Sequence, residues 1–482
     1  MSAGSIEYSS AAGRGVVLAA VLGSGMAMLD GTVVNVALKT IGKDLDASLA
    51  QLQWITNGYL LLLASLILLG GALGDRLGRR RVFLIGVVWF AVASLLCGIA
   101  PDPRTLIAAR VLQGIGGALL TPGSLAIIEA VFARADRARA IGSWSGLGSI
   151  AAAIGPFVGG GLVQYADWRW IFLINAPMAA VTVVVALKFV PETRAVSEGR
   201  FDVPGAVLAA VFLGGLTYWL IEWGTTYAPT ALVVGVVAGG AFLVVEHRTA
   251  HPMLPLSMFA SRNFSAANAM TLLVYAALGA ILFFLVIDLQ TVLGYGALEA
   301  GLATLPMTVI MLFLAARGGA LGARIGPRIP MTVGPIVMAV GVAWLSLVGA
   351  ATSYWTGVLP PLVVFSLGLA LMVAPLTATV LAAAPEGRAG IASGVNNAVA
   401  RAGSLVAVAA LPVAVGLSGD QYADPVVFDT AYGKAMLVCA GLLAVGGVVS
   451  WLTISHGPVV APEDEHELAP SPHQLDCPHV GH

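Results

Sequence analysis

Residues 71–80 have the sequence GALGDRLGRR, and residues 319–328 have the sequence GALGARIGPR. The two segments agree at seven of ten positions, and each stands in a short charged turn between two long apolar runs. A turn that occurs twice in one chain indicates that the helical bundle around it also occurs twice.

Apolar runs recur along nearly the whole chain. Hydrophobic residues make up 58% of the 482 residues and charged residues only 10%, whereas about a quarter of a soluble domain is charged. Because a helix needs about 20 apolar residues to cross a bilayer, we predict an all-α integral membrane protein with fourteen transmembrane helices. The predicted spans are 15–38, 51–74, 82–100, 105–127, 139–162, 168–190, 202–222, 228–246, 265–288, 298–316, 329–349, 356–382, 388–415 and 432–455.

The positive charges support this count. If both termini lie in the cytoplasm, 17 of the 24 Lys and Arg residues fall in cytoplasmic segments, 5 fall in outer segments, and Arg110 and Arg401 lie within spans. This asymmetry satisfies the positive-inside rule, which one missing or extra helix would break. Most of the basic residues are Arg, which is typical of a GC-rich bacterium. We therefore expect a multi-pass protein of a bacterial plasma (inner) membrane with both termini cytoplasmic.

The spacing of the repeat indicates how the spans are grouped. The two copies of the turn are eight spans apart, whereas two parallel six-helix halves would place them six apart. Two helices are therefore inserted between the halves. The predicted organisation is a cytoplasmic N-terminus at 1–14, a six-helix bundle at 15–190, two inserted helices at 202–246, a second six-helix bundle at 265–455 and a disordered cytoplasmic tail at 456–482.

Two charged residues, Asp30 and Arg110, lie inside predicted spans. At 1.5 Å per residue, Asp30 is about 22 Å from the inner end of its helix, and Arg110 is about 7–8 Å from the outer end of its own, so both have the same depth in a core of about 30 Å. A charge in a membrane span is costly and indicates a partner or a watery cavity. We therefore predict that the two side chains pair.

The pair also suggests a way to carry protons. A carboxylate beside a guanidinium keeps its charge, and it takes up a proton when the two separate. Arg is not deprotonated in proteins, so Asp30 is the expected proton carrier and Arg110 its modulator. A static pair that only fixes helix packing is the alternative that the sequence leaves open.

Several motifs resemble those of the major facilitator superfamily, and within it those of the fourteen-span drug:proton antiporters of the EmrB/QacA type. They are the turn at 71–80, the first-helix segment 28–38, the fourth-helix segment 110–114, the fifth-helix glycines and the segment 168–177. The resemblance implies a major facilitator fold, proton-coupled export and alternating access. Lys39 and Ala151 depart from the family pattern, which usually has Pro and Gly there.

The resemblance also implies two groups of functional glycines and charges. The expected cytoplasmic gate consists of Gly71, Asp75, Arg76, Gly78, Arg79 and Arg80. The expected antiporter motif consists of Gly142, Gly155, Pro156, Gly159 and Gly160, and its Gly-Pro step permits a kink and close helix packing. In the second copy of the turn, Ala323 replaces the Asp. If charges hold the cytoplasmic side closed, the carboxylate must therefore come from the first half alone.

Further polar residues in or near the spans are candidates for substrate binding or coupling. They are Asn35, Asn57, Glu299, Asn397 and Arg401. Arg401 contacts an anionic group in the cavity, or it donates to backbone carbonyls; both remain open. For Asp288 and Glu299, near outer helix ends, solvation or capping is the better explanation, and a second proton site is the alternative.

Other classes of protein find little support. The sequence has no G-x-x-x-x-G-K-[ST] loop for ATP, and only two of its seven histidines, His247 and His251, precede the tail. We therefore predict a proton-driven exporter of a small amphipathic or cationic compound, without enzyme activity, cofactor, metal or nucleic-acid partner, and monomeric. A dedicated exporter of one natural product, or a proton-coupled importer of the same superfamily, is the alternative.

Overall fold

The structure is a computed structural model that describes residues 6–194, 201–385 and 388–455. The predicted tail at 456–482 lies outside the described residues. The described part is built of helices, with one isolated bridge between Ile6 and Phe132.

Helices of the first half follow one another through short turns. They are α1 (Ala11–Asp44), α2 (Leu49–Leu77), α3 (Arg79–Gly98), α4 (Pro103–Val131), α5 (Arg134–Tyr165), α6 (Trp170–Leu173) and α7 (Asn175–Phe189). Two further helices, α8 (Val203–Ile221) and α9 (Ala228–Arg248), lead to the second half.

The second half begins after a 3-10 turn at Leu256–Ala260. Its helices are α10 (Arg262–Thr291), α11 (Ala297–Ala303), α12 (Leu305–Ile325), α13 (Arg328–Leu345), α14 (Leu359–Ala382), α15 (Ala389–Val415) and α16 (Pro425–Thr453). A π-helical turn at Tyr354–Val358 precedes α14, and a 3-10 turn at Gln421–Ala423 precedes α16.

The predicted fold class is confirmed, with differences in detail. Thirteen described helices, counting α6 with α7 and α11 with α12 as single spans, are long and apolar enough to cross a membrane. The predicted span 139–162 lies within α5, a helix of 32 residues in addition to these thirteen. The helices also extend past several predicted ends: α1 begins at Ala11 and ends at Asp44 rather than spanning 15–38.

Two helices start at an Asp followed by Pro. Asp102 accepts hydrogen bonds from the Arg104 and Thr105 amides at the start of α4, with Pro103 in the first turn. Asp424 caps α16 in the same way, with Pro425 after it. Proline fits the first turn because its missing N–H would have no partner there, so these Asp-Pro steps fix where the helices begin.

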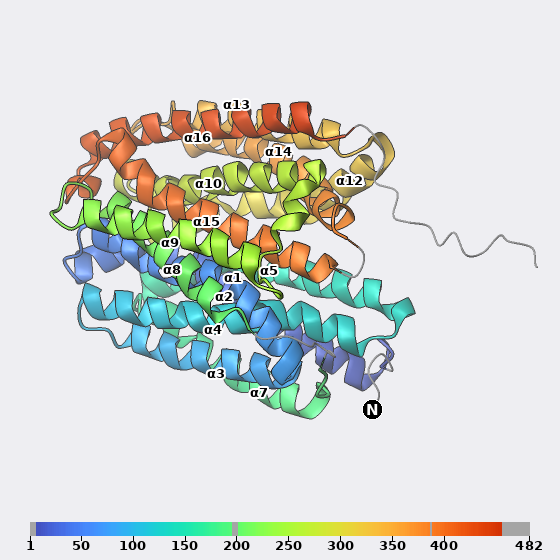
Figure 1. Ribbon diagram of the computed structural model, residues 1–482. Coiled ribbons are helices and arrows are strands. Elements are labelled where there is room, and N and C mark those ends of the chain that lie inside the picture. Colours follow the sequence, from blue (N-terminus) through green and yellow to red (C-terminus); the bar gives the residue numbers. More distant parts are fainter. Residues whose placement is uncertain (1–5, 195–200, 386–387, 456–482) are drawn as a thin grey trace, which may run out of the picture.

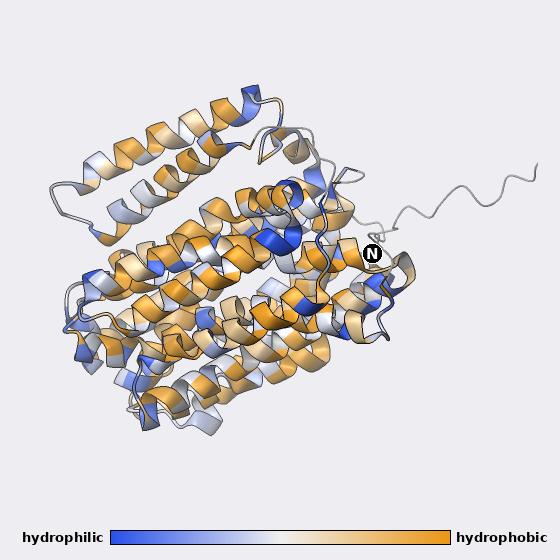
Figure 2. Ribbon diagram, turned by 90° about the horizontal axis from the view of Figure 1, so that it is seen from below, coloured by the Kyte–Doolittle hydropathy of each residue, from blue (hydrophilic) through white to orange (hydrophobic). Residues whose placement is uncertain are grey.

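The two halves lie side by side, and α8 and α9 cross one side of them (Figure 1). α8 packs against α9 and also against α2 and α15, which meet at the seam between the halves. The halves also meet where α5 packs against α11 and α12, and where α1 packs against α10. Hydrophobic residues run along the helices, and hydrophilic residues gather at their ends (Figure 2), as expected for a bundle that crosses a bilayer.

The bundle has two different ends. We call the end where α1 begins the basic end, because the turn with Arg76, Arg79, Arg80 and Arg81 lies there. We call the opposite end, where α1 stops at Asp44, the far end.

Hydrogen bonds described between the halves lie at the far end. Lys39 Nζ donates to the Gln290 carbonyl at 2.5 Å, and Gln290 Nε2 donates to the Val36 carbonyl at 2.9 Å. Gln53 Nε2 donates to the Val408 carbonyl at 2.7 Å, and Tyr422 Oη donates to the Ala47 carbonyl at 2.9 Å. The structure is therefore closed at the far end.

The sequence repeat is a structural repeat. Gly78 after α2 and Gly326 after α12 both have positive φ, +115° and +83°, which L-residues with a side chain rarely adopt. A Cβ at Gly70 would overlap the Ala118 carbonyl, and a Cβ at Gly318 would overlap the Ala370 carbonyl. Each half therefore brings its second and fourth spans into backbone contact in the same way.

We expect Gly70→Leu and Gly318→Leu each to lower the melting temperature of the detergent-purified protein, because overpacking of this kind costs about 1–3 kcal/mol or more. Gly240→Leu on α9 is the matched control, since nothing lies within 4 Å of a Cβ there. Equal melting temperatures for all three variants would contradict the close packing.

Candidate functional site

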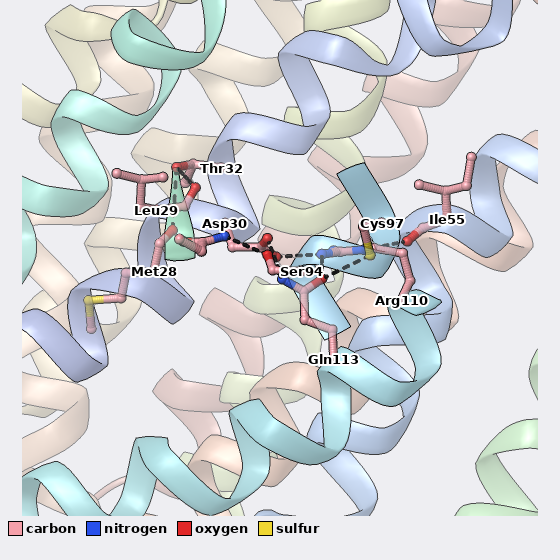
Figure 3. Close-up of polar contacts among 10 residues, drawn as sticks. Met28, Leu29, Asp30, Thr32, Ile55, Ser94, Cys97, Arg110 and Gln113 are labelled. Carbon is pink, nitrogen blue, oxygen red and sulfur yellow. Dashed lines mark hydrogen bonds and ion pairs between the residues drawn. The ribbon is translucent and has the colours of Figure 1, made fainter. Parts of the chain in front are cut away.

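Asp30 and Arg110 meet in the interior of the first half, as their depths predict. Arg110 Nη1 donates to Asp30 Oδ2 at 2.5 Å, and Gln113 Nε2 donates to Asp30 Oδ1 at 2.8 Å (Figure 3). Arg110 Nη1 also donates to Gln113 Oε1 at 2.6 Å, and Arg110 Nε donates to the Ile55 carbonyl at 3.0 Å. Both carboxylate oxygens therefore have a donor, and α1, α2 and α4 are joined at one point.

The network continues to α3 and α7. Gln113 Nε2 also donates to Ser94 Oγ at 3.0 Å, and Asn175 Nδ2 donates to the same oxygen at 2.8 Å. Asp30 and Arg110 are each only 1% exposed, and Gln113, Ser94 and Asn175 are fully buried. The whole network therefore lies away from water and lipid.

Two aromatic rings border the guanidinium. The Arg110 Cζ atom lies 4.5 Å from the centre of the Tyr59 ring and 5.7 Å from that of Phe172. A ring face attracts a cation, most strongly where water is absent. Arg110 is thus held by a carboxylate, an amide, a carbonyl and two rings, which offset the loss of its hydration.

No role in this network was expected for Gln113, Ser94 or Asn175, although Gln113 and Asn175 lie in the motif segments 110–114 and 168–177. Gln113 was detectable, because residues three apart on a helix share a face and it follows Arg110 by three. Ser94 carries no such signal, since single polar residues in apolar helices are common.

Two glycines of the predicted antiporter motif pack α5 against α1 next to Asp30. A Cβ at Gly155 would overlap Thr32 Oγ1, and one at Gly159 would lie 2.7 Å from Val33 Cγ1. Thr32 Oγ1 donates to the Leu29 carbonyl at 2.9 Å, so these contacts border the turn that holds Asp30.

The same stretch of α5 touches the second half. A Cβ at Gly160 would lie 2.7 Å from the Ala297 carbonyl, and a Cβ at Gly301 would overlap the carbonyl of Pro156. This segment of α5 therefore contacts α1 and α11. Gly142 lies apart from it, in the half of α5 toward the basic end, where nothing is within 4 Å of a Cβ.

At the predicted gate, Asp75 pairs within its own half. Arg79 Nη2 lies 2.7 Å from Asp75 Oδ1, across the end of α2. Arg76 lies with its Cζ atom 4.8 Å from the centre of the Phe201 ring, and a Cβ at Gly71 would lie 3.6 Å from Pro122 Cβ.

An acidic residue that the sequence reasoning missed completes this turn. The Glu192 carboxylate accepts hydrogen bonds from the Arg80 and Arg81 amides at 3.1 and 3.2 Å. A carboxylate at a helix N-terminus satisfies free amides and the helix dipole. A side chain at Gly78 would collide with Glu192, since its Cβ would lie 2.6 Å from Oε1.

Among the other candidates, Asn57 lies on α2 between Ile55 and Tyr59, which both contact Arg110. Asn57 on α2 is fully buried, and both of its side-chain polar atoms lack a partner among the described residues. Arg401 on α15 is within electrostatic range of Tyr59, the ring that borders Arg110, and of Tyr275. The second half thus places a cation close to the polar network of the first.

The remaining candidates lie elsewhere. Asn397 Nδ2 donates to the Ser393 carbonyl at 3.0 Å on an exposed face of α15, and Asn35 is half-buried on α1. Glu299 accepts a hydrogen bond from the Gly296 amide at 2.9 Å and caps α11, which is the capping role considered above. Among the described residues, no three His, Cys, Asp or Glu side chains group as metal ligands would.

The chain matches the Major Facilitator Superfamily over residues 20–408. It is 36% identical over 421 residues to the tetracenomycin C resistance and export protein of Streptomyces glaucescens, covering 85% of this chain and 77% of that protein. It is 35% identical over 438 residues to the methylenomycin A resistance protein of Streptomyces coelicolor, covering 89% and 90%.

A solved structure shows the same fold. A bacterial homologue of the human lysosomal transporter Spinster, in an inward-facing and unoccupied conformation, superimposes with a TM-score of 0.65 at 18% identity and covers 92% of this chain and 97% of that one. The chain belongs to the Major Facilitator Superfamily. It is a multi-pass membrane transporter of small molecules and not an enzyme, as predicted.

We expect Arg110→Met to destabilise the protein by about 3–5 kcal/mol, because removing one partner of a buried pair leaves the other charge unpaired. Adding Asp30→Leu should recover most of this loss, and the exposed Arg104→Met on the same helix serves as control. Thermal unfolding in detergent measures the difference. If the double variant is less stable than Arg110→Met alone, the pair is not the unit that we describe.

Asp75→Ala should favour opening of the basic end. Ala323 stands at the equivalent position of the second half, so any charge interaction that holds this end closed depends on the Asp75 carboxylate. The expected coupling is about 1–3 kcal/mol, with turnover falling more than substrate affinity. The readout is the labelling rate of a cysteine introduced at the exposed Gly142, with Cys477 replaced by Ser.

Ala323→Asp is the control for this measurement, because Pro327 stands where the first copy has Arg79. It should leave the labelling rate unchanged. Equal labelling and equal transport in Asp75→Ala and the unaltered protein would show that Asp75 is an ordinary charge in a solvated turn.

Proposed function

We propose that the protein exports a small amphipathic or cationic antibiotic-like compound in exchange for protons, by alternating access between its two halves. The observation that carries the proposal is the buried Asp30, which has a donor on each oxygen and an arginine beside it. One relative is named as a resistance and export protein and the other as a resistance protein, and these names favour export over import.

Asp30 is the proposed proton carrier. In the structure its carboxylate is compensated by Arg110 and Gln113, so the charged form is stable there. A movement of α4 relative to α1 would take these donors away, and an unpaired carboxylate in an apolar interior binds a proton. The Gly155 and Gly159 contacts tie this step to α5, which reaches the second half through Gly160.

The substrate is proposed to bind between the halves near Tyr59. Asn57 offers a buried donor and acceptor that lack a protein partner among the described residues, and buried polar groups without partners are costly unless a ligand or water meets them. Arg401 supplies a positive charge from the other half, which suits an anionic or hydrogen-bond-accepting group of an amphipathic substrate. Substrate binding and proton binding at Asp30 would then compete through this shared region.

Orientation follows from the arginines. We propose that the basic end faces the cytoplasm of a bacterium, which places both termini there and makes the described structure closed to the outside. A monomer suffices for this mechanism, because both halves belong to one chain, and the proton gradient supplies the energy without a cofactor.

A dedicated exporter of one natural product is the second candidate. The two relatives described above are each named for a single antibiotic. A panel of chemically unrelated dyes and antibiotics separates the two candidates, since a dedicated exporter transports one member or none of the panel.

Asp30→Asn should abolish uphill export from everted vesicles, because the amide keeps the shape and part of the hydrogen bonding and cannot titrate. Export is measured with the panel above, with and without a collapsed proton gradient. The variant should remain folded in the membrane, which its yield and size-exclusion profile in detergent show.

Asp46→Asn is the matched control, since Asp46 is an exposed acid just past the far end of α1. It should transport like the unaltered protein. Undiminished uphill export by Asp30→Asn would remove Asp30 from the mechanism.

A further inference from the structure

A second buried carboxyl group lies outside the network, on Asp288 in the last turn of α10. Asp288 is fully buried, and neither carboxyl oxygen has a hydrogen-bond partner among the described residues. The buried Tyr432 on α16 interacts electrostatically with it, and its hydroxyl also lacks a described partner. One turn earlier on α10, Phe284 stacks on Phe428 of α16 with ring centres 5.8 Å apart. The carboxyl group therefore sits between tightly packed apolar helices.

The charges around Asp288 do not compensate it. Asp429 on α16 is the charged residue that interacts with it electrostatically, and its charge has the same sign. Among the other elements that pack against α10, α1 contributes Lys39, α11 contributes Glu299 and α15 contributes Arg401. Lys39 donates to the Gln290 carbonyl, Glu299 caps α11, and Arg401 interacts with Tyr59 and Tyr275. α14 carries no titratable side chain.

The helix itself also opposes a negative charge at this position. The Asp288 carbonyl accepts hydrogen bonds from the Val292 and Leu293 amides, so the residue lies at the C-terminal end of α10. The C-terminus is the negative end of the helix dipole. Burial, an acidic neighbour and the dipole thus all favour the neutral acid, and a buried carboxylate without a partner would be costly.

Asp288 stands next to the contact that closes the far end. Gln290, two residues further along α10, accepts the hydrogen bond from Lys39 and donates to the Val36 carbonyl on α1. Ionisation of Asp288 would require water or a new donor at the end of α10. Admitting either would disturb the packing that holds Gln290 against α1.

We propose that Asp288 is a second proton-binding site, in the far-end gate: with its proton bound the halves close through Gln290, and loss of the proton opens them. This inference rests on the proposed proton antiport and adds a site in the second half to Asp30 in the first. A proton taken up from the far side would thus favour closure of that side.

The test measures the far-end distance between the halves as a function of pH. Spin labels are placed at Arg104→Cys on α4 and Val426→Cys on α16, both exposed near the far end, with Cys477 replaced by Ser. The measurement is made in lipid nanodiscs and in the Asp30→Asn background, so that titration of Asp30 does not contribute. This background should shift from the short to the long distance as the pH rises from acidic to alkaline.

Adding Asp288→Asn or Asp288→Leu should hold the short distance across the whole pH range. Adding Asp429→Asn, which removes the neighbouring half-buried acid on α16, should leave a pH-dependent shift. A shift that persists in both Asp288 variants, or no shift in the Asp30→Asn background, would overturn the proposal. A further outcome is that the unaltered protein exports nothing against a gradient while Asp288 still controls the pH dependence of the far-end distance. That result would contradict the antiport proposal and support the role of Asp288 in the far-end gate.

Discussion

One ion pair in an apolar interior constrains the first half of this transporter. Neither Asp30 nor Arg110 is reached by water in the described structure, so each depends on the other and on neutral donors and acceptors from neighbouring helices. The carboxylate lies on α1, the guanidinium and the amide on α4, and the supporting carbonyl on α2. Any movement that separates α1 from α4 must therefore change either the pairing or the protonation of the carboxylate, and this is the requirement for coupling a conformational change to a proton.

Much of this arrangement was predictable from the sequence. The apolar runs and the asymmetry of the arginines indicated the helices and their order, and the depths of Asp30 and Arg110 indicated their contact. The repeated turn indicated two halves, and positive φ at Gly78 and Gly326 shows that the backbone repeats as well. These features could be predicted because the membrane restricts where charges, glycines and long apolar runs occur. A long apolar run forms a spanning helix, and a charge inside a span needs a partner or water.

Other features have no comparable signal. Glu192 is one acid in a connecting segment, and nothing in its neighbourhood indicates that it receives the amides of α3. The unpaired state of Asp288 depends on which helices surround it, so the sequence alone did not separate a solvated acid from a buried one. α5 was assigned as a span, but the sequence did not show that its glycines contact two helices, α1 in the first half and α11 in the second.

The far-end contact has a consequence for how such proteins diverge. Its acceptors are mostly main-chain oxygens, those of Val36, Ala47, Val408 and Gln290. A main-chain oxygen survives almost any substitution of its residue, so the inheritance of this contact depends on the few donor side chains and on helix register. Substitutions at Val36, Ala47 and Val408 that keep the helix packing would therefore retain these acceptors and the seal between the halves.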